Sequence, residues 1–297
     1  SLETRVLNYF LTIADTGNMS KAAQELHVTQ PTLSRQIRSL EDDLGTKLFS
    51  RDNKKMTLTS AGIMFQERAS QIVQMIDKTT QDIQNQDELK GVITIGCVES
   101  SVARFLGTMV KKFHHQFPAI HFSLYDADAE DIKEKLDNNL VDLGFVLSPV
   151  EIAKYEYLSL PVIDHWGLVV LKNSPIAKQD YVSLDQLPSL PLIVPARRIV
   201  QDEVSSWMKI PSKQLNIVGS QNLLSNSLFL VKDEIGDVLC AKESYSLRPD
   251  PDLTFVPIKT TEQIHHMVIW PKNHSLTPAT KKFIHLIKNQ LAEQEVD

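Results

Sequence analysis

Residues 30–44 carry two separate stripes at helical spacing, and this pattern constrains the fold more than any other feature of the chain. The apolar stripe falls at i, i+4, i+7 and i+11, on Leu33, Ile37, Leu40 and Leu44. Thr29 precedes the stripes as a plausible N-cap, and Gly45 follows them as a helix stop. A helix this short needs other helices against its apolar face to be stable. We therefore expect a small helical domain built around it.

The second stripe is polar and basic, and it opens at the N-terminus of the same helix. Arginine pairs bidentately with guanine, glutamine pairs with adenine, and small hydroxyl groups reach phosphates or bases. A helix N-terminus also favours a nearby phosphate. Entry of this helix into the major groove of DNA is therefore expected. The predicted DNA-reading residues are Gln30, Pro31, Thr32, Ser34, Arg35 and Arg38.

Weaker signals on both sides predict a three-helix unit with a wing. Upstream, apolar residues at helical spacing predict one helix that ends at Gly17 and a two-turn helix over residues 19–26. Downstream, residues 47–59 predict two short strands around the polar Asp52–Lys55 turn. Basic side chains of this wing are expected to follow the DNA backbone. These residues are Arg51, Lys54 and Lys55.

The net charge of the whole chain argues mildly against DNA binding, because DNA-binding proteins need a basic face. The chain carries 31 Lys and Arg against 37 Asp and Glu, a net charge of −6. Residues 1–60, however, carry eight basic and seven acidic side chains, and residues 91–297 contribute −5 of the total. The acids Glu41, Asp42 and Asp43 also cluster at the end of the third helix, away from its arginines. We expect a modest number of phosphate contacts per protomer.

The segments SKAAQELHVTQPTLSRQIRSLEDDLGTKLFSR and LTSAG resemble the N-terminal winged helix-turn-helix of the LysR-type transcriptional regulators. The resemblance implies a DNA-binding domain over residues 1–58. It also implies that two protomers read the two halves of a pseudo-palindromic promoter site in double-stranded DNA. A core-only role for such a long ordered match is the less favoured interpretation.

A long helix is predicted after the wing, with residues 59–90 as linker and NQDELKG as its hinge. Steps of four and three place mostly apolar residues on one seam, which is typical of a coiled coil. The residues predicted to pair two protomers are Phe65, Ala69, Ile72, Ile76 and Ile83. Gly62 and Thr79 weaken the seam, and a helix packed on its own domain is the alternative. In LysR-type regulators this helix joins protomers, so the resemblance implies a homodimer or homotetramer.

From Gly91 onward, strands alternate with helices, which predicts mainly parallel sheets with ligands at the carboxyl ends of the strands. KGVITIGCVESSVARFL and FPAIHFSLYDADAEDIKEKLDNNLVDLGFVL resemble the effector domain of the same family, an α/β domain with two lobes of the periplasmic-binding-protein type. The resemblance implies a regulatory domain over residues 91–297. Lobe I is expected over about 91–162 and 268–297, and lobe II over about 163–267. VKDEIGDVLCAKES fits as well, although Cys240 and Ala241 replace the usual Leu-Pro type of residues.

Strand-to-helix corners are the candidates for binding a small-molecule effector, because helix N-termini offer free N–H groups. The candidates are Ser100, Ser101, Ser148, Pro149, Ala196, Arg197, Arg198, Ser220, Asn222 and Cys240. An inward-facing arginine would call for a carboxylate or phosphate on the effector. The two serines at 100 and 101 are alternatively ordinary helix caps, and the two arginines are alternatively surface groups.

Other function classes have less support. No apolar run approaches the roughly 18 residues of a membrane helix, and we expect no signal peptide and no membrane partner. The cysteines Cys97 and Cys240 have no CxxC spacing, which indicates a cytoplasmic protein. No nucleotide-binding, metalloprotease or hydrolase motif occurs, so we expect no enzyme, no cofactor and no metal. A solute-binding protein, a cysteine-dependent enzyme and a winged-helix regulator of another family without an effector are the alternatives.

Overall fold

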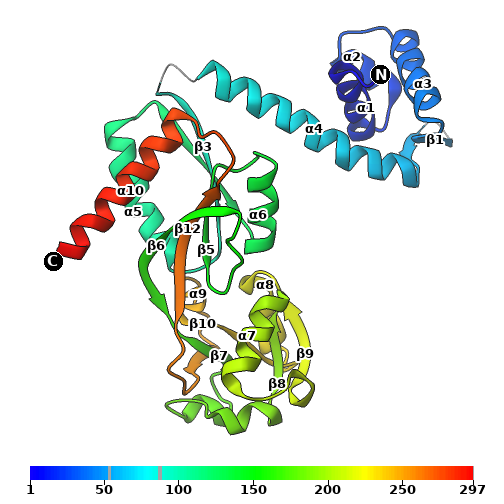
Figure 1. Cartoon of the computed structure of the whole chain (residues 1–297). Helices are drawn as coiled ribbons and strands as arrows, with labels where there is room; N and C mark the ends of the chain where they lie inside the picture. The colour runs from blue at the N-terminus through cyan, green and yellow to red at the C-terminus, as the bar shows by residue number, and fades with distance from the viewer. Residues whose placement is uncertain (53–54, 86–88, 297) are drawn as a thin grey trace. The chain divides into compact units, whose positions relative to one another are not determined.

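A computed structural model describes residues 1–52, 55–85 and 89–296 (Figure 1). The chain divides into two compact units, Ser1–Ile83 and Gln84–Asp297. Each unit has its own hydrophobic core, and each is described by itself. None of the described helices combines the length and the apolar character needed to span a bilayer.

The first unit is a three-helix domain with a two-stranded wing, as predicted. Its elements are α1 (Thr4–Thr16), α2 (Met19–Glu25), α3 (Gln30–Leu44), β1 (Phe49–Asp52), β2 (Lys55–Leu58) and α4 (Ser60–Gln84). Strands β1 and β2 pair antiparallel. Gly17 ends α1 and Gly45 ends α3, both in the left-handed conformation, with φ of 66° and 69°. These two glycines allow the sharp chain reversals that fold three short helices onto one core.

The first part of α4 belongs to the core of this unit, which corrects part of the predicted seam. Phe10 is fully buried, and its ring centroid lies 4.8 Å from that of Phe65 and 5.1 Å from that of Phe49. Ala69 is fully buried as well. Ala69 therefore cannot contact a partner protomer, and Phe65 is used mainly within its own domain. The predicted alternative, a helix packed on its own domain, holds for this part of α4.

The second part of α4 leaves its apolar side chains in solvent within the single chain. Ile72 and Ile76 are 42% and 38% exposed, and Ile83 is 65% exposed. These three residues are the part of the predicted pairing seam that is open to a partner, and their role in pairing stays a prediction. The length of α4 that can pair is shorter than the seam predicted from the sequence.

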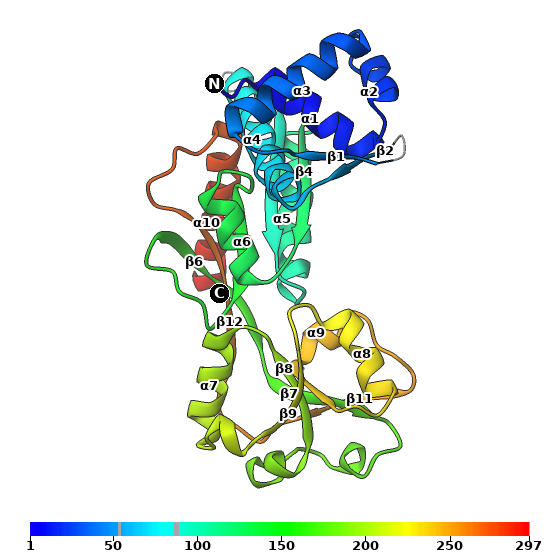
Figure 2. The ribbon, with the colours of Figure 1, turned by 90° about the vertical axis from the view of Figure 1, so that its right-hand side faces the viewer.

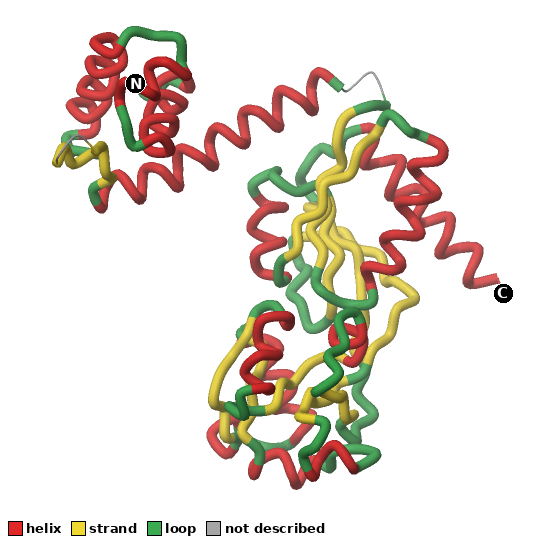
Figure 3. Tube along the Cα trace, turned by 180° about the vertical axis from the view of Figure 1, so that it is seen from behind, coloured by secondary structure: helices red, strands yellow, loops and turns green. Residues whose placement is uncertain are grey.

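Lobe I of the second unit is a five-stranded sheet with helices on both faces. Its elements are β3 (Gly91–Cys97), α5 (Val102–Gln116), β4 (Ile120–Asp126), α6 (Ala129–Asp137), β5 (Leu143–Leu147), β6 (Tyr155–Asp164), β12 (Ile264–Pro271) and α10 (Pro278–Val296). The strand order is β4-β3-β5-β12-β6. Helices α5 and α10 cover one face and α6 covers the other (Figures 1 and 3). The carboxyl ends of β3, β4 and β5 thus meet at one edge of the sheet, because these three strands are parallel.

Lobe II repeats this layered plan. Its strands and α-helices are β7 (Trp166–Leu171), β8 (Pro191–Pro195), α7 (Arg198–Met208), β9 (Asn216–Gln221), α8 (Leu224–Lys232), β10 (Asp237–Ala241), α9 (Lys242–Ser246) and β11 (Leu253–Pro257). Three 3-10 helices complete it, at Pro175–Lys178, Leu184–Ser189 and Ser212–Gln214. The strand order is β11-β7-β10-β8-β9. Helix α7 packs against one buried cluster on one face of this sheet. Helices α8 and α9 pack against a second buried cluster on the other face.

Both sheets are mixed, whereas mainly parallel sheets were expected. Strand β12 is antiparallel to β5 and β6, and β7 is antiparallel to β10 and β11. The antiparallel strands are those at which the chain passes between the lobes, at Asp164–Trp166 and again between Pro257 and Ile264 (Figure 2). Strand β6 was missing from the sequence prediction, and it carries the first of these passages.

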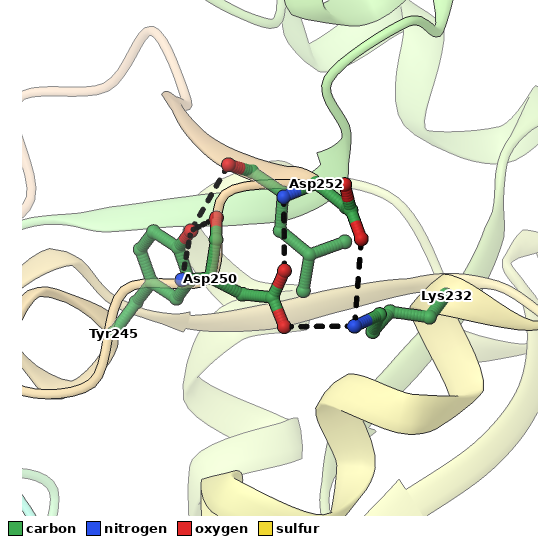
Figure 4. Close-up of polar contacts among 5 residues, drawn as sticks. Lys232, Tyr245, Asp250 and Asp252 are labelled. Carbon is green, nitrogen blue, oxygen red and sulfur yellow. Dashed lines mark hydrogen bonds and ion pairs between the residues drawn. The ribbon is translucent and has the colours of Figure 1, made fainter.

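Two polar clusters hold this connected fold together. Asp164 is buried at the first passage, where its carboxylate accepts hydrogen bonds from the backbone N–H of His165 (2.8 Å) and of Glu243 (3.1 Å). In lobe II, Lys232 Nζ at the end of α8 lies 3.0 Å from Asp250 Oδ2 and 3.5 Å from Asp252 Oδ2 (Figure 4). The Tyr245 hydroxyl donates to the carbonyl of Leu253 at the start of β11 and accepts from the backbone N–H of Asp250. These contacts fix the loop before β11 against α8.

Candidate DNA-reading face and inter-lobe cavity

Helix α3 separates its core stripe from its polar stripe as the sequence predicted, with one exception. Leu33, Ile37 and Leu40 are buried, whereas Leu44 is 39% exposed because α3 ends there at Gly45. The predicted DNA-reading residues lie on the other side of the helix. Gln30, Pro31, Arg35 and Arg38 are exposed, and Thr32 and Ser34 are half-buried.

The N-terminus of α3 is organised by two hydroxyl groups. Thr29 caps the helix as predicted, because its Oγ1 accepts a hydrogen bond from the backbone N–H of Thr32 at 3.3 Å. Ser20 of α2 donates to Oε1 of Gln30 at 3.0 Å. The amide oxygen of Gln30 is therefore held toward α2, and its NH2 group stays available as a donor. This orientation suits an acceptor on a base edge or a phosphate.

The wing carries exposed basic side chains. Arg51 on β1 and Lys55 on β2 are exposed, and their strands pair in register with Asp52 opposite Lys55. The third predicted wing residue, Lys54, lies outside the described residues.

Glu41 departs from the predicted acidic cluster at the end of α3. Its side chain is only 3% exposed, and its Oε2 accepts a hydrogen bond from the backbone N–H of Leu48 at 2.8 Å. Glu41 thus ties α3 to the chain that enters the wing. Asp42 and Asp43 are exposed, so two of the three acids face solvent.

A cavity of about 100 Å³ lies between lobe I and lobe II. Its walls come from the carboxyl ends of β3 and β5, from the loop before α6, and from the corners that precede α7 and α8. Most of the lining is apolar, including Val98, Leu147, Trp166, Val200 and Leu224. An apolar cavity with a few polar groups is typical of small-molecule sites.

Four of the predicted effector residues line this cavity. They are Ala196, Arg197, Asn222 and Cys240. Ser220 lines a neighbouring, more polar cavity of about 540 Å³, which Asn222 also borders. These five positions share the corners of lobe II at which strands end, the feature that led to their selection.

Three other predicted effector residues, Ser100, Ser148 and Pro149, form hydrogen bonds within the protein, whereas the Ser101 hydroxyl is buried without a partner among the described residues. Ser100 is fully buried, and its Oγ lies 2.9 Å from Nε2 of His266 and also accepts from the N–H of Val102. Ser148 accepts a hydrogen bond from the N–H of His265 at 3.0 Å, and the carbonyl of Pro149 accepts one from Arg197. Ser101 precedes α5 without capping it and does not line the cavity. In lobe I, choosing residues at strand-to-helix corners therefore selected side chains that hold β12 and α5 in place.

The adjacent arginines differ completely. The Arg197 side chain is 9% exposed, its Nη2 donates to the Pro149 carbonyl at 2.9 Å, and it lies 3.7 Å from Glu130 Oε1. Its Nε is buried without a hydrogen-bond partner, and burial lowers the pKa of the guanidinium. The Arg198 side chain is 92% exposed and points away, 3.9 Å from Asp202. Arg198 is therefore a surface group, and its prediction as an effector ligand was wrong.

Sequence reasoning missed two carboxylates and three other polar or aromatic residues of the cavity. Glu99, Asp128, Trp166, Gln221 and Ser244 all line it. Glu99 and Asp128 each lie two residues beyond the end of a parallel strand, β3 and β4. The same rule that selected Ser100 could have found both carboxylates, because parallel strands point their carboxyl ends to one edge.

Neither cysteine is an activated nucleophile. Burial raises the pKa of Cys97 to about 12, with a further contribution from Asp126. Burial also raises the pKa of Cys240 far above its usual range. Both thiols are thus protonated near neutral pH, and a protonated thiol attacks poorly. The interpretation of this chain as a cysteine-dependent enzyme has no structural support.

A winged helix-turn-helix followed by a two-lobed domain with a cavity between the lobes defines a ligand-responsive DNA-binding regulator. Two family models match the chain and give the class its name. Residues 4–63 match the model for bacterial regulatory helix-turn-helix proteins of the lysR family, and residues 86–292 match the LysR substrate binding domain. The chain belongs to the LysR family of transcriptional regulators. LysR regulators bind DNA and effector molecules and form oligomers.

Individual relatives agree with this assignment. The chain is 27% identical over 296 residues to the Hca operon transcriptional activator HcaR of Escherichia coli (strain K12), covering 98% of this chain and 99% of HcaR. It is 30% identical over 190 residues to the HTH-type transcriptional regulator YvbU of Bacillus subtilis (strain 168), a match that spans 63% of this chain and 64% of YvbU. Full-length CbnR, solved in complex with its target DNA, superposes with a TM-score of 0.74 at 24% identity, covering 97% and 99% of the two chains. The predicted fold class is confirmed.

Proposed function

We propose that this LysR regulator reads promoter DNA with the exposed stripe of α3 and senses, in the inter-lobe cavity, a small metabolite that carries a carboxylate or phosphate group. The stripe consists of Gln30, Pro31, Thr32, Ser34, Arg35 and Arg38, with Arg51, Lys54 and Lys55 of the wing on the flanking backbone. A regulator that binds the bacterial chromosome acts in the cytoplasm, so this is the location that we propose.

The DNA-reading proposal rests mainly on the exposure of Arg35 and Arg38 next to a capped helix N-terminus. Two recognition helices of an oligomer would meet the two halves of one pseudo-palindromic site. If Arg35 reads a base, Arg35→Ala should weaken specific binding by about 1–3 kcal/mol. Gel-shift titration on the region upstream of this protein's own gene measures the loss. Arg68→Ala, an exposed arginine on α4 away from the stripe, is the control.

The anionic-effector proposal rests on one observation: Arg197, whose Nε is buried without a hydrogen-bond partner among the described residues, is a cation that lines the cavity. Arg197 is also the residue before α7, an 11-residue helix whose N-terminus has no side-chain cap. Unpaired backbone N–H groups at such an end favour a carboxylate or phosphate. Ala196, Asn222 and Cys240 complete the proposed effector contacts.

A matched pair of substitutions tests this site. A metabolite library is first screened for compounds that raise the melting temperature of the full-length protein. For any anionic compound found, Arg197→Gln should abolish the shift, whereas Arg198→Gln should leave it unchanged, because only Arg197 lines the cavity. Equal responses of the two variants would contradict the proposal.

The effector should act by changing how tightly the lobes close on each other. A ligand that binds one arrangement of the lobes more tightly shifts the population toward it. We propose that this shift alters the arrangement of protomers and the DNA bend or half-site spacing, and not the presence of binding as such. Footprinting with and without the effector should then show a changed protection pattern.

A further inference from the structure

We infer that the effector is a small zwitterion, an amino carboxylate with a short apolar body, whose carboxylate lies on lobe II and whose ammonium group lies on lobe I. This inference rests on the proposed effector site at Arg197. It adds a second, oppositely charged end to that site. The argument uses the charges of the cavity wall, their existing partners and the size of the cavity.

Lobe I brings two carboxylates and no cation to the cavity wall. Glu99 follows β3, and its Oε1 accepts one hydrogen bond from the Ser225 hydroxyl at 2.5 Å. Asp128 precedes α6, and its Oδ1 accepts one from the backbone N–H of Asp131 at 3.0 Å. Within the described residues, neither carboxylate forms an ion pair. A carboxylate has about four acceptor positions, so both side chains retain acceptor capacity.

The single cation of the lining does not balance these acids. Arg197 already lies 3.7 Å from Glu130, and the charge of Asp128 also acts on it. A ligand with only negative charge would be attracted by Arg197 and repelled by Glu99 and Asp128. A ligand with only positive charge would be attracted by the two carboxylates, repelled by Arg197, and would offer the buried guanidinium no acceptor. A zwitterion offers a carboxylate to Arg197 and an ammonium group to the two acids.

The middle of the cavity sets the body of the ligand. Leu147 of lobe I and Trp166, Val200 and Leu224 of lobe II all belong to the lining. These side chains match a short aliphatic group, and a cavity of about 100 Å³ matches a small ligand. The chemical class that fits is an α-amino acid with a small apolar side chain, or an amino carboxylate of similar size.

Such a ligand would join the two lobes through its own charges. The carboxylate would bind Arg197 and the N-terminus of α7, and the ammonium group would bind Glu99 and Asp128. Each half of the molecule alone would contact one lobe. Only the complete zwitterion would therefore favour the closed arrangement of the lobes.

The test compares whole molecules with their halves on the full-length protein. The probes are L-alanine, L-valine and L-leucine, with the carboxylic acid that lacks the amino group and the amine that lacks the carboxylate for each skeleton. Thermal shift and isothermal titration at millimolar concentration measure binding. We expect at least one amino acid to bind and its two halves to bind at least tenfold more weakly, since each half loses a charged hydrogen bond.

Charge-neutral variants locate the ammonium site. Glu99→Gln can still accept from Ser225, and Asp128→Asn can still cap α6, so both should fold. Each should weaken amino-acid binding roughly tenfold, and neither should weaken binding of the carboxylic acid. Glu134→Gln, an exposed acid on α6 outside the cavity, is the control.

The outcomes separate this inference from the proposed function. If the carboxylic acids bind as tightly as the amino acids, the inference is wrong and the anionic-effector proposal stands. If no amino acid of the panel binds, the inference is overturned. If amines alone bind and Arg197→Gln has no effect on them, the proposed anion site fails as well.

Discussion

Two alanine substitutions at helical glycines should have opposite effects, and the reason lies in what a Cβ atom would meet. Gly62 lies in the first turns of α4, and Gly107 lies in α5. A Cβ on Gly62 would lie 2.1 Å from the backbone oxygen of Leu48. A Cβ on Gly107 would meet nothing within 4 Å. Only the first substitution therefore introduces a clash.

The magnitudes follow from two competing effects. Replacing glycine by alanine inside a helix gains about 0.5–1 kcal/mol. At Gly62 the clashing atom is backbone, so α4 must move by about 1 Å away from Leu48, and overpacking of this kind costs about 1–3 kcal/mol or more. We expect Gly62→Ala to lose about 2 kcal/mol and Gly107→Ala to gain about 0.5–1 kcal/mol. In a domain of this size, 2 kcal/mol corresponds to a loss of roughly 10 °C in melting temperature.

Hydrogen exchange with peptide resolution is the appropriate assay, because the two units can unfold separately. Gly62→Ala should speed exchange in residues 33–73 and leave lobe I unchanged. Gly107→Ala should slow exchange in α5. A Gly62→Ala protein as protected as wild type would refute the steric reasoning, and so would a destabilised Gly107→Ala protein.

Three further predictions concern stability and assembly. Burial raises the pKa of Asp237 to about 6, against about 3.9 in an unfolded chain. Ionised Asp237 therefore lowers the free energy of unfolding. This loss of stability is absent below pH 4 and complete above pH 6. Asp237→Asn should therefore stabilise the protein by on the order of 1 kcal/mol at pH 7, after allowance for solvent screening, and by nothing at pH 3.5 in urea titrations; a pH-independent gain would contradict this cause. Glu41→Ala should cost about 2 kcal/mol and expose the Leu48 amide to exchange, with Asp42→Ala near neutral. Ile72→Glu should weaken self-association about tenfold or more in analytical ultracentrifugation if α4 pairs protomers, whereas Ile63→Glu, 60% exposed but off the seam, should not.

Local patterns of the sequence were sufficient to predict the DNA-binding unit. The N-cap at Thr29 and the left-handed stops at Gly17 and Gly45 are interactions between residues close in sequence, so they could be recognised without the fold. Burial of Glu41 could not, because its partner Leu48 is reached only after the chain turns back at Gly45. A run of three acids gives no sign that one of them points inward.

The seam and the cavity show two different limits of sequence reasoning. Spacing of three and four fits a helix packed on its own domain as well as one packed on a partner. Helix α4 does the first at Ala69, whereas Ile72 stays exposed within the single chain. Strand β6 was missed because it alternates buried and exposed residues irregularly and contains Pro161. For Arg197 and Arg198, the corner is predictable, but which neighbour turns inward depends on the distant carbonyl of Pro149.

The burial of Ala69 has a practical meaning for anyone who recombines regulators of this family. A fragment that stops at residue 58 would leave Phe10 without Phe65 and would open the core where Ala69 fits. Val73 also packs against that core, so the smallest autonomous DNA-binding fragment should extend at least one turn beyond it. A chimera that keeps the DNA specificity of this protein should thus be joined after Ile83, with most of α4 inherited from the same parent as the recognition helix.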